Sequence, residues 1–205
     1  MKYTGPKARK VRRLGMNLYA ADKYDKILQR KPYGPGKGPK TRSGRDSEYA
    51  KQLKEKQRAR EMYGLSERQF RRLYSEATRA KGQTGEMMKR LLEQRLDNVI
   101  YRAGLALTRL QARQFAGHGL FTIDGHRVTV PSYRVRPGEV ITIRPRVKDS
   151  PVFTAIVERH DKYLPPKWLK VAPTDRTIEI VALPGPEDAE QAVDMRQVVE
   201  FYSRT

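Results

Sequence analysis

Cysteine is absent from this chain of 205 residues. Without thiols the protein has neither disulfides nor a cysteine-rich zinc site. No apolar run approaches the roughly 20 residues that span a membrane, and the first residues lack the apolar stretch of a signal peptide. His118, His126 and His160 have no metal-site or catalytic-triad spacing, so we read them as structural or surface residues. We expect a cytoplasmic protein with no metal and no cofactor.

Negative charge is also scarce, because 43 Lys and Arg residues stand against 23 Asp and Glu residues, for a net charge of +20. Residues 1–90 hold 26 basic and 9 acidic residues, whereas residues 150–205 hold 7 and 9. A segregated excess of this size indicates a polyanionic partner. Because each neutralised phosphate releases counterions, binding should weaken with salt, with a slope of roughly −0.7 to −0.9 per contact.

Residues 1–45 are rich in Lys, Arg, Gly and Pro and poor in aliphatic side chains. Alone they cannot bury enough apolar surface to offset the entropy of ordering. They form either a solvated tail or an extended arm that folds against RNA. Cations beside tyrosines favour the arm, since rings stack on bases while cations neutralise phosphates. The basic and aromatic residues that suggest contact are Lys7, Arg9, Lys10, Arg12, Arg13 and Tyr33.

Helical periodicity begins after this arm. A first helix is predicted from Ser47 to Met62, with Lys51, Lys54 and Arg58 on exposed positions. Ser66 and Gln69 then form a capping box that opens a second helix. The arginines of this second helix, Arg68, Arg71 and Arg72, are either a solvated face or RNA contacts. The high positive charge of the segment favours RNA.

Two further helices are predicted on either side of Gly104. Apolar residues three and four apart give the first of them an inward stripe. Thr108 is the N-cap of the second, and Gln111 can reach back to the Thr108 amide to complete a capping box. Arg109 and Arg113 lie one turn apart along the edge of this helix, where they are available to a ligand.

The sequence after these helices alternates as strands do. Leu120 to Ile123 and His126 to Val130 flank Asp124-Gly125, a two-residue hairpin turn signal. Further strands are predicted from Val140 to Ile143, from Val152 to Glu158 and from Thr177 to Ala182, the last two joined by a long connection. We therefore expect two helices packed on a small antiparallel sheet.

The last residues, from Val193 to Tyr202, predict a short helix that needs a packing partner. We expect it to fold back on the N-terminal helices, which makes the sheet-containing unit an insertion. The predicted class is α+β, a helical N-terminal domain with an extended basic arm and an inserted domain. The predicted segments are the arm at 1–45, the helical domain at 46–94 with 190–205, and the inserted domain at 95–189.

The motifs RLDN, TRLQAR, GHG, IDG, VPSY and PGEVI resemble the S4-type RNA-binding domain family. The flanking segments YTGPKARKVRRLG, SEYAKQLKEKQRAREMYGLSERQFRRLY and VVEFYS extend the resemblance to a family of bacterial small-subunit ribosomal proteins. The resemblance implies a primary binder of small-subunit rRNA that nucleates assembly of the subunit body. It also implies contact with ribosomal protein S5 and other small-subunit proteins, an effect on translational accuracy, and mRNA at the entry channel. Some relatives repress their own mRNA, which this sequence neither shows nor excludes.

The same resemblance assigns residues to these roles. Arg42 and Arg45 match the basic pair at the mRNA entry channel. Some relatives carry a cysteine-rich zinc site in the arm, but residues 31–45 hold none of its ligands, so this arm should need RNA to order. The positions that match rRNA contacts are the arm from Lys7 to Arg13, then Tyr49, Lys51, Lys54, Arg58, Arg71, Arg72, Arg109, Arg113 and His118.

Two other functional classes were weighed against this one. Domains of this type are appended to pseudouridine synthases and to an aminoacyl-tRNA synthetase, but the remaining chain is too short for such a catalytic domain. GPGKGPK lacks the spacing and the final Ser or Thr of a phosphate-binding loop, and Asp97 suits pairing with Arg95 or Arg102 better than general-base catalysis. A free-standing RNA-binding factor would have no use for the N-terminal helices. We therefore predict no enzymatic activity, no small-molecule substrate and no membrane partner.

Overall fold

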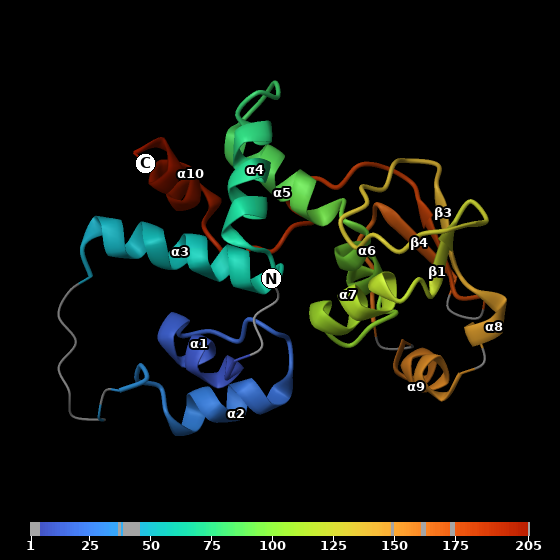
Figure 1. Cartoon of the computed structure of the whole chain (residues 1–205), viewed down its shortest axis with the longest axis horizontal. Coiled ribbons are helices and arrows are strands. Elements are labelled where there is room, and N and C mark those ends of the chain that lie inside the picture. Colours follow the sequence, from blue (N-terminus) through green and yellow to red (C-terminus); the bar gives the residue numbers. More distant parts are fainter. Residues whose placement is uncertain are drawn as a thin grey trace. The chain divides into compact units, whose positions relative to one another are not determined.

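The computed structural model describes residues 5–36, 38, 46–148, 150–160, 163–172 and 175–204. Its contacts divide the chain into two units, Met1–Met88 with Gln191–Thr205, and Lys89–Glu190 (Figure 1). The chain passes into the second unit after Met88 and returns to the first after Glu190, whereas the predicted boundaries follow residues 94 and 189. The α+β class is confirmed, because the described residues form helices and one five-stranded sheet.

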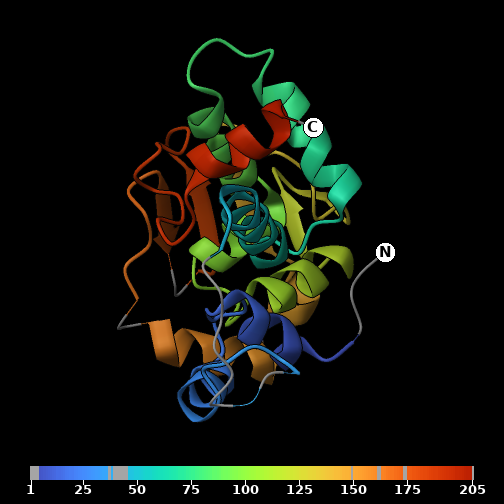
Figure 2. The ribbon, with the colours of Figure 1, turned by 90° about the vertical axis from the view of Figure 1, so that its left-hand side faces the viewer.

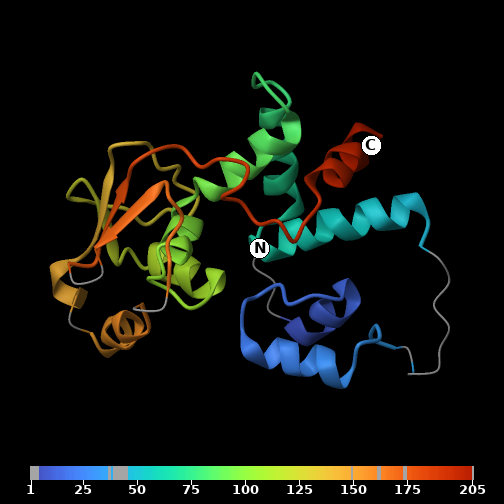
Figure 3. The ribbon, with the colours of Figure 1, turned by 180° about the vertical axis from the view of Figure 1, so that it is seen from behind.

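The regular elements described in the first unit are helices. α10 packs beside α3, and α1 lies beside α2 (Figures 2 and 3). α5 begins in the first unit and ends in the second. In chain order the helices are α1 (Lys7–Leu14), α2 (Asp22–Arg30), α3 (Glu48–Met62), α4 (Glu67–Ala77), α5 (Thr84–Glu93) and α10 (Met195–Ser203).

The extended arm predicted for residues 1–45 is wrong for residues 7–30, which are largely helical. Their few apolar side chains do not act alone, because α1 packs on α3 and Val11 is fully buried. Tyr19 and Tyr24 are also buried, with ring centroids 5.3 Å apart. Arg58 of α3 donates to the Leu14 carbonyl at 2.9 and 2.7 Å, which satisfies the C-terminal end of α1. A neighbouring helix thus supplies the apolar surface that the segment lacks.

The sequence signals at the starts of α3 and α4 are confirmed. The Ser47 hydroxyl accepts the Ala50 amide at 3.3 Å at the start of α3. Ser66 and Gln69 exchange both hydrogen bonds of a capping box, at 3.3 and 3.2 Å. These caps satisfy amides that have no partner inside the helix, so each helix begins where its sequence indicates.

The C-terminal helix α10 has the packing partner that a helix of nine residues needs. Gln52 of α3 donates to Glu200 of α10 at 2.9 Å. The Asp194 amide, just before α10, donates to Glu55 of α3 at 3.2 Å. Residues from the two ends of the chain therefore complete one helical unit.

A buried lysine joins α3 to α4 and α10. The Lys56 amine lies 2.9 Å from a Glu67 carboxylate oxygen and 4.6 Å from the centre of the Phe201 ring. Tyr202 donates to the same carboxylate oxygen at 2.7 Å. Burial alone would raise the pKa of Glu67, but the hydrogen bonds from Lys56 and Tyr202 outweigh burial and lower it. Burial and the bond to Glu67 raise the pKa of the Tyr202 hydroxyl.

The second unit packs helices against one antiparallel sheet of order β2-β1-β3-β5-β4. Phe121, Ile141 and Ile178 are fully buried in its core. In chain order its elements, after the end of α5, are α6 (Leu96–Arg102), α7 (Arg109–Gly117), β1 (Phe121–Ile123), β2 (His126–Arg127), β3 (Val140–Ile143), α8 (Pro145–Lys148), α9 (Pro151–His160), β4 (Leu169–Ala172) and β5 (Thr177–Ile180).

The strand predicted from Val152 to Glu158 is wrong, because these residues belong to α9. Phe153 and Ile156, three positions apart, are buried in the core, whereas Val152 is exposed. That spacing suits one face of a helix, and Pro151 occupies a first helical position, which proline favours. The long connection predicted before Thr177 also differs, because it contains the strand β4 (Leu169–Ala172).

Local chemistry sets the α7 start and the β1–β2 hairpin. Thr108 caps α7 by accepting the Gln111 amide at 3.2 Å, as predicted. The Gln111 side chain, however, accepts the Leu107 amide at 2.8 Å, so the reciprocal bond to Thr108 was predicted wrongly. Asp124 and Gly125 have φ values of 47° and 83°, which is the two-residue hairpin turn that the sequence predicted.

Candidate nucleic-acid interface

A groove of about 850 Å³ lies in the first unit, between α1, residues 32–35 and α3. Its lining brings together side chains that the sequence singled out separately in the arm and in α3. Cations outnumber carboxylates in this lining, five to two. The cationic and aromatic lining residues are Lys10, Arg12, Arg13, Tyr33, Lys54 and Arg60.

Arg12 builds one wall of this groove. Its guanidinium donates to the carbonyl oxygens of Tyr33 and Gly34 at 3.1 and 3.2 Å. The same guanidinium lies 5.1 Å from the centre of the Tyr33 ring, within cation–π range. Carbonyls and a ring satisfy its donors without cancelling its charge, so the wall stays positive.

Two acids neutralise part of the groove. Glu61 accepts from Lys10 at 2.6 Å and from Arg60 at 2.7 Å. Asp46 lies 3.7 Å from the Lys54 amine, with both side chains more than a third exposed, so solvent weakens this pair. A single carboxylate between two cations leaves a net positive charge, which suits a phosphate group.

The other predicted contacts of α1 lie outside or at the edge of this groove. Arg13 lines it and is exposed, whereas Arg9 is exposed but is not among the lining residues. Lys7 lies 5.6 Å from the centre of the Tyr19 ring, so its amine covers the α1–α2 core. The structure therefore separates residues that the sequence placed in one cluster.

The predicted contacts of α3 also divide. Tyr49 is 56% exposed, with its ring centroid 5.6 Å from that of Phe201, so one side of the ring is open for stacking. Lys51 forms an exposed ion pair with Glu48 at 2.6 Å. Arg58 instead serves the protein itself, because it holds the end of α1 and pairs with Glu55.

The arginines of α4 lie on its exposed face. Arg68, Arg71 and Arg72 are all exposed, while Phe70 and Leu73 between and beside them are buried. An apolar face thus fixes the helix and leaves the cations in solvent. This arrangement is compatible with both alternatives, a solvated face and an RNA contact.

In the second unit, a basic turn follows α7. His118 is exposed, and its carbonyl accepts from Arg127 at 3.2 Å. The next carbonyl, that of Gly119, accepts from Arg144 at 3.4 Å. Arg113 is 26% exposed and lies 3.4 Å from Asp97. Two arginines, Arg127 of β2 and Arg144 just after β3, therefore bond to this turn, whereas Arg113 of α7 pairs with Asp97 of α6.

Asp97 has a structural role. It accepts from Arg95 at 3.1 and 2.8 Å, in a bidentate pair where both side chains are less than a tenth exposed. Of the two partners that the sequence left open, Arg95 and Arg102, the structure pairs Asp97 with Arg95.

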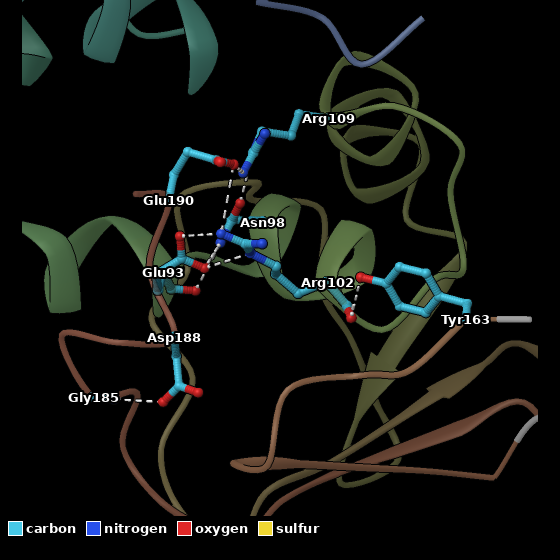
Figure 4. A network of polar contacts seen from close by, with 8 residues as sticks. All are labelled: Glu93, Asn98, Arg102, Arg109, Tyr163, Gly185, Asp188 and Glu190. Carbon is cyan, nitrogen blue, oxygen red and sulfur yellow. Dashed lines mark hydrogen bonds and ion pairs between the residues drawn. The ribbon is translucent and has the colours of Figure 1, made fainter. Parts of the chain in front are cut away.

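Arg109 lies in a buried charged network with Glu93, Asn98, Arg102 and Glu190 (Figure 4). Its side chain is only 10% exposed. It donates to Asn98 at 3.0 Å and to Glu190 at 3.0 Å. The sequence placed Arg109 with Arg113 on a free helix edge, but the structure gives Arg109 internal partners.

Three cations of these surfaces were missed by the sequence reading. Arg60 could have been found, because Lys54, Gln57 and Arg60 repeat every three residues along one helix face. Arg127 and Arg144 carry no such signal, since strand pairing and the turn at Gly119 bring them near α7.

Three further points complete the description of the site. Arg42 and Arg45, predicted for the mRNA entry channel, lie outside the described residues. Within the described residues, no group of three or more His, Cys, Asp or Glu side chains could hold a metal ion. No helix in the described ranges is long and apolar enough to cross a membrane.

The chain is similar to known proteins over 99% of its length. The family model described as ribosomal protein S4/S9 N-terminal domain matches residues 2–93, and the S4 domain model matches residues 94–141. The small ribosomal subunit protein uS4 of Roseiflexus sp. (strain RS-1) is 44% identical over 206 residues, which cover 99% of each chain. The proteins of the same name from Cutibacterium acnes and Pelotomaculum thermopropionicum are 45% and 44% identical, again over 99% of each chain.

Proposed function

The chain belongs to the family of small ribosomal subunit protein uS4, and on that premise we propose that it is a primary binder of small-subunit rRNA. Membership makes it a structural constituent of the small ribosomal subunit, in the bacterial cytoplasm, and not an enzyme. Its contribution is then to hold RNA segments in place without chemistry.

The observation that carries this proposal is the basic groove of the first unit. It combines cations that can neutralise phosphates with an aromatic ring, that of Tyr33, at its wall. Irregular RNA exposes both phosphates and unstacked bases, so a groove with both features suits a junction better than a regular duplex. Two acids in the lining restrict where a phosphate can sit, which favours shape recognition over uniform attraction.

The second unit supplies a separate proposed contact surface. His118, just after α7, is exposed, as is Arg127 of β2, which donates to the His118 carbonyl; Arg113 and Arg144 are partly exposed. S4-type domains are RNA-binding modules, which supports the same role here. Tyr49, Lys51, Lys54, Arg71 and Arg72 remain proposed contacts of the first unit, with the α1 cations.

The finer roles rest on family resemblance. We propose that binding at a multi-helix rRNA junction nucleates assembly of the subunit body. Contact with ribosomal protein S5, an influence on decoding accuracy, and contact of Arg42 and Arg45 with mRNA at the entry channel belong to the same proposal. Repression of the chain's own mRNA is a further possibility for an RNA-binding protein of this family.

Filter binding across a salt series tests the central proposal. The purified chain is titrated with an rRNA fragment that spans the small-subunit junction, and with an unrelated RNA of equal length. Binding by shape predicts that the junction fragment keeps its advantage as salt rises. If both affinities fall with one slope and no gap, the net charge alone accounts for binding.

A second measurement separates the ribosomal role from that of a free-standing RNA-binding factor. The chain is mixed with small subunits and sedimented at high salt. A subunit constituent should remain with the subunits, because many contacts act together. A free factor should be released at moderate salt.

A further inference from the structure

The charged network around Arg109 is formed by residues of the second unit (Figure 4). Arg102 donates to both oxygens of Glu93 at 3.0 and 3.1 Å and lies 3.8 Å from Glu190. Asn98 donates to Glu93 at 2.6 Å and accepts from Arg109 at 3.0 Å. Two arginines and two glutamates, bridged by one amide, therefore form a cluster without net charge.

Most side chains of the cluster are shielded from solvent, and Glu190 is the most exposed at 29%. Glu93 is fully buried, and the side chains of Arg102 and Arg109 are 17% and 10% exposed. The Arg109 guanidinium also lies 4.5 Å from the centre of the Tyr101 ring. If Arg109 turned to a phosphate, it would leave Glu190 facing that phosphate, and two negative groups would repel.

The partners of Arg109 come from distant parts of the chain. Asn98 lies on α6, and Glu190 is the last residue of the second unit. A turn precedes Glu190, in which the Gly185 amide donates to Asp188 at 2.8 Å and Ala189 is buried. Arg109 thereby fastens the first turn of α7 both to α6 and to the segment 185–190.

We propose that Arg109 is a positioning residue that fixes α7 through Glu190 and Asn98, and is not a phosphate ligand. The proposal rests on the proposed rRNA binding and corrects the role expected for Arg109. The end of α7, with His118 and the neighbouring Arg127, is then the part of the helix that meets RNA. Glu190, an acid, supports RNA binding by holding Arg109.

The direction in which one substitution changes the affinity for junction RNA separates the two roles. Glu190→Gln removes a negative charge, so simple electrostatics predicts equal or tighter binding to the junction RNA. Positioning predicts the opposite, a weakening by roughly threefold or more, within the range of coupled networks. Glu179→Gln is the matched control, because Glu179 is an exposed acid of the same unit, paired only with exposed Lys170 at 3.3 Å in the described structure.

The salt dependence of Arg109→Gln gives an independent readout. Loss of a phosphate ligand makes the slope of log affinity against log salt less steep by about 0.7 to 0.9. Loss of a positioning residue lowers the affinity but leaves this slope nearly unchanged. Arg109→Lys adds a milder variant that keeps the charge. Lysine can replace arginine at a phosphate but cannot bond Asn98 and Glu190 as a planar fork, so positioning predicts weaker binding for this variant also.

The inference is overturned if Glu190→Gln binds the junction RNA as tightly as Glu179→Gln does. It is overturned as well if Arg109→Gln makes the salt slope less steep by about 0.7 or more. It is also overturned if Arg109→Lys binds like the unmodified chain. Fluorescence of Trp168, which is buried in the core of this unit, establishes that each variant is folded.

Hydrogen exchange keeps this inference distinct from the proposed function. Without RNA, the Ala112 amide, which bonds to the Thr108 carbonyl at 3.0 Å in the first turn of α7, should exchange severalfold faster in Glu190→Gln. If the unmodified chain shows no preference for junction RNA, rRNA binding as proposed fails, yet faster exchange still supports the positioning contact. Unchanged exchange overturns the contact whatever the RNA result.

Discussion

Replacing Gly119 by alanine tests the turn that carries the basic surface after α7. Gly119 has a φ of 64°, in the left-handed region, and directly follows exposed His118. A Cβ atom at this position would lie 2.5 Å from Arg127 Nε and 2.8 Å from the Thr129 methyl group. Backbone conformation and side-chain packing therefore both require glycine.

The expected loss of stability follows from these contacts. A left-handed conformation costs a residue with a Cβ atom roughly 1–2 kcal/mol. Arg127 can move away, but it gives up its bond to the His118 carbonyl, worth about 1 kcal/mol net. Thr129 is β-branched and stiff, so overpacking adds about 1 kcal/mol or more. Together these effects predict a loss of roughly 3–4 kcal/mol.

Urea denaturation followed by Trp168 fluorescence measures this loss in the second unit. The chain has one tryptophan, and it is buried in the core of this unit. Gly125→Ala is the control, because Gly125 has a φ of 83° but no atom within 4 Å of the added Cβ atom. The control should lose only the backbone cost of roughly 1–2 kcal/mol. Equal losses in the two variants would refute the packing argument at Gly119.

Three other perturbations have definite expected outcomes. The lowered pKa of Glu67 stabilises the fold above about pH 4.5, the unfolded value, and this stability is lost as pH falls through the folded pKa. Denaturation at a series of pH values should therefore show that the free energy of unfolding falls less steeply at acid pH for Glu67→Gln than for the unmodified chain. Phe121→Ala removes a fully buried ring and should cost about 3–5 kcal/mol in the same fluorescence assay; a loss below 1 kcal/mol would contradict the core position. Arg58→Met leaves the Leu14 carbonyl without its donor and should lower stability by about 1.5–3 kcal/mol, measured by far-UV circular dichroism, whereas exposed Arg71→Met should change it by under 0.5 kcal/mol.

Signals that act within a few residues were readable from the sequence. Ser66 and Gln69 cap α4 because their side chains reach amides three positions away. Asp124 and Gly125 form the hairpin turn because both tolerate positive φ. The concentration of cations in residues 1–90 likewise pointed to a polyanionic partner without any knowledge of the fold. The cap and the turn depend on neighbouring residues, and the charge depends on composition, so each can be read from the sequence.

Contacts between distant residues were decided only by the tertiary structure. Residues 1–45 looked too poor in apolar side chains to fold alone, but α3 packs on α1, and Arg58 reaches Leu14, 44 positions earlier. The residues from Val152 to Glu158 alternate as a strand does, but they form part of a helix that buries Phe153 and Ile156 in the core.

The candidate interface shows the same contrast between local signals and distant contacts. Sequence alone determined that Arg109 is a cation near the start of a helix, with Thr108 as its cap. It could not reveal that Glu190, 81 positions later, accepts a hydrogen bond from the Arg109 guanidinium at 3.0 Å. Whether that guanidinium meets solvent or an acid depends on where the distant segment 185–190 returns to α7, which only the tertiary structure decides.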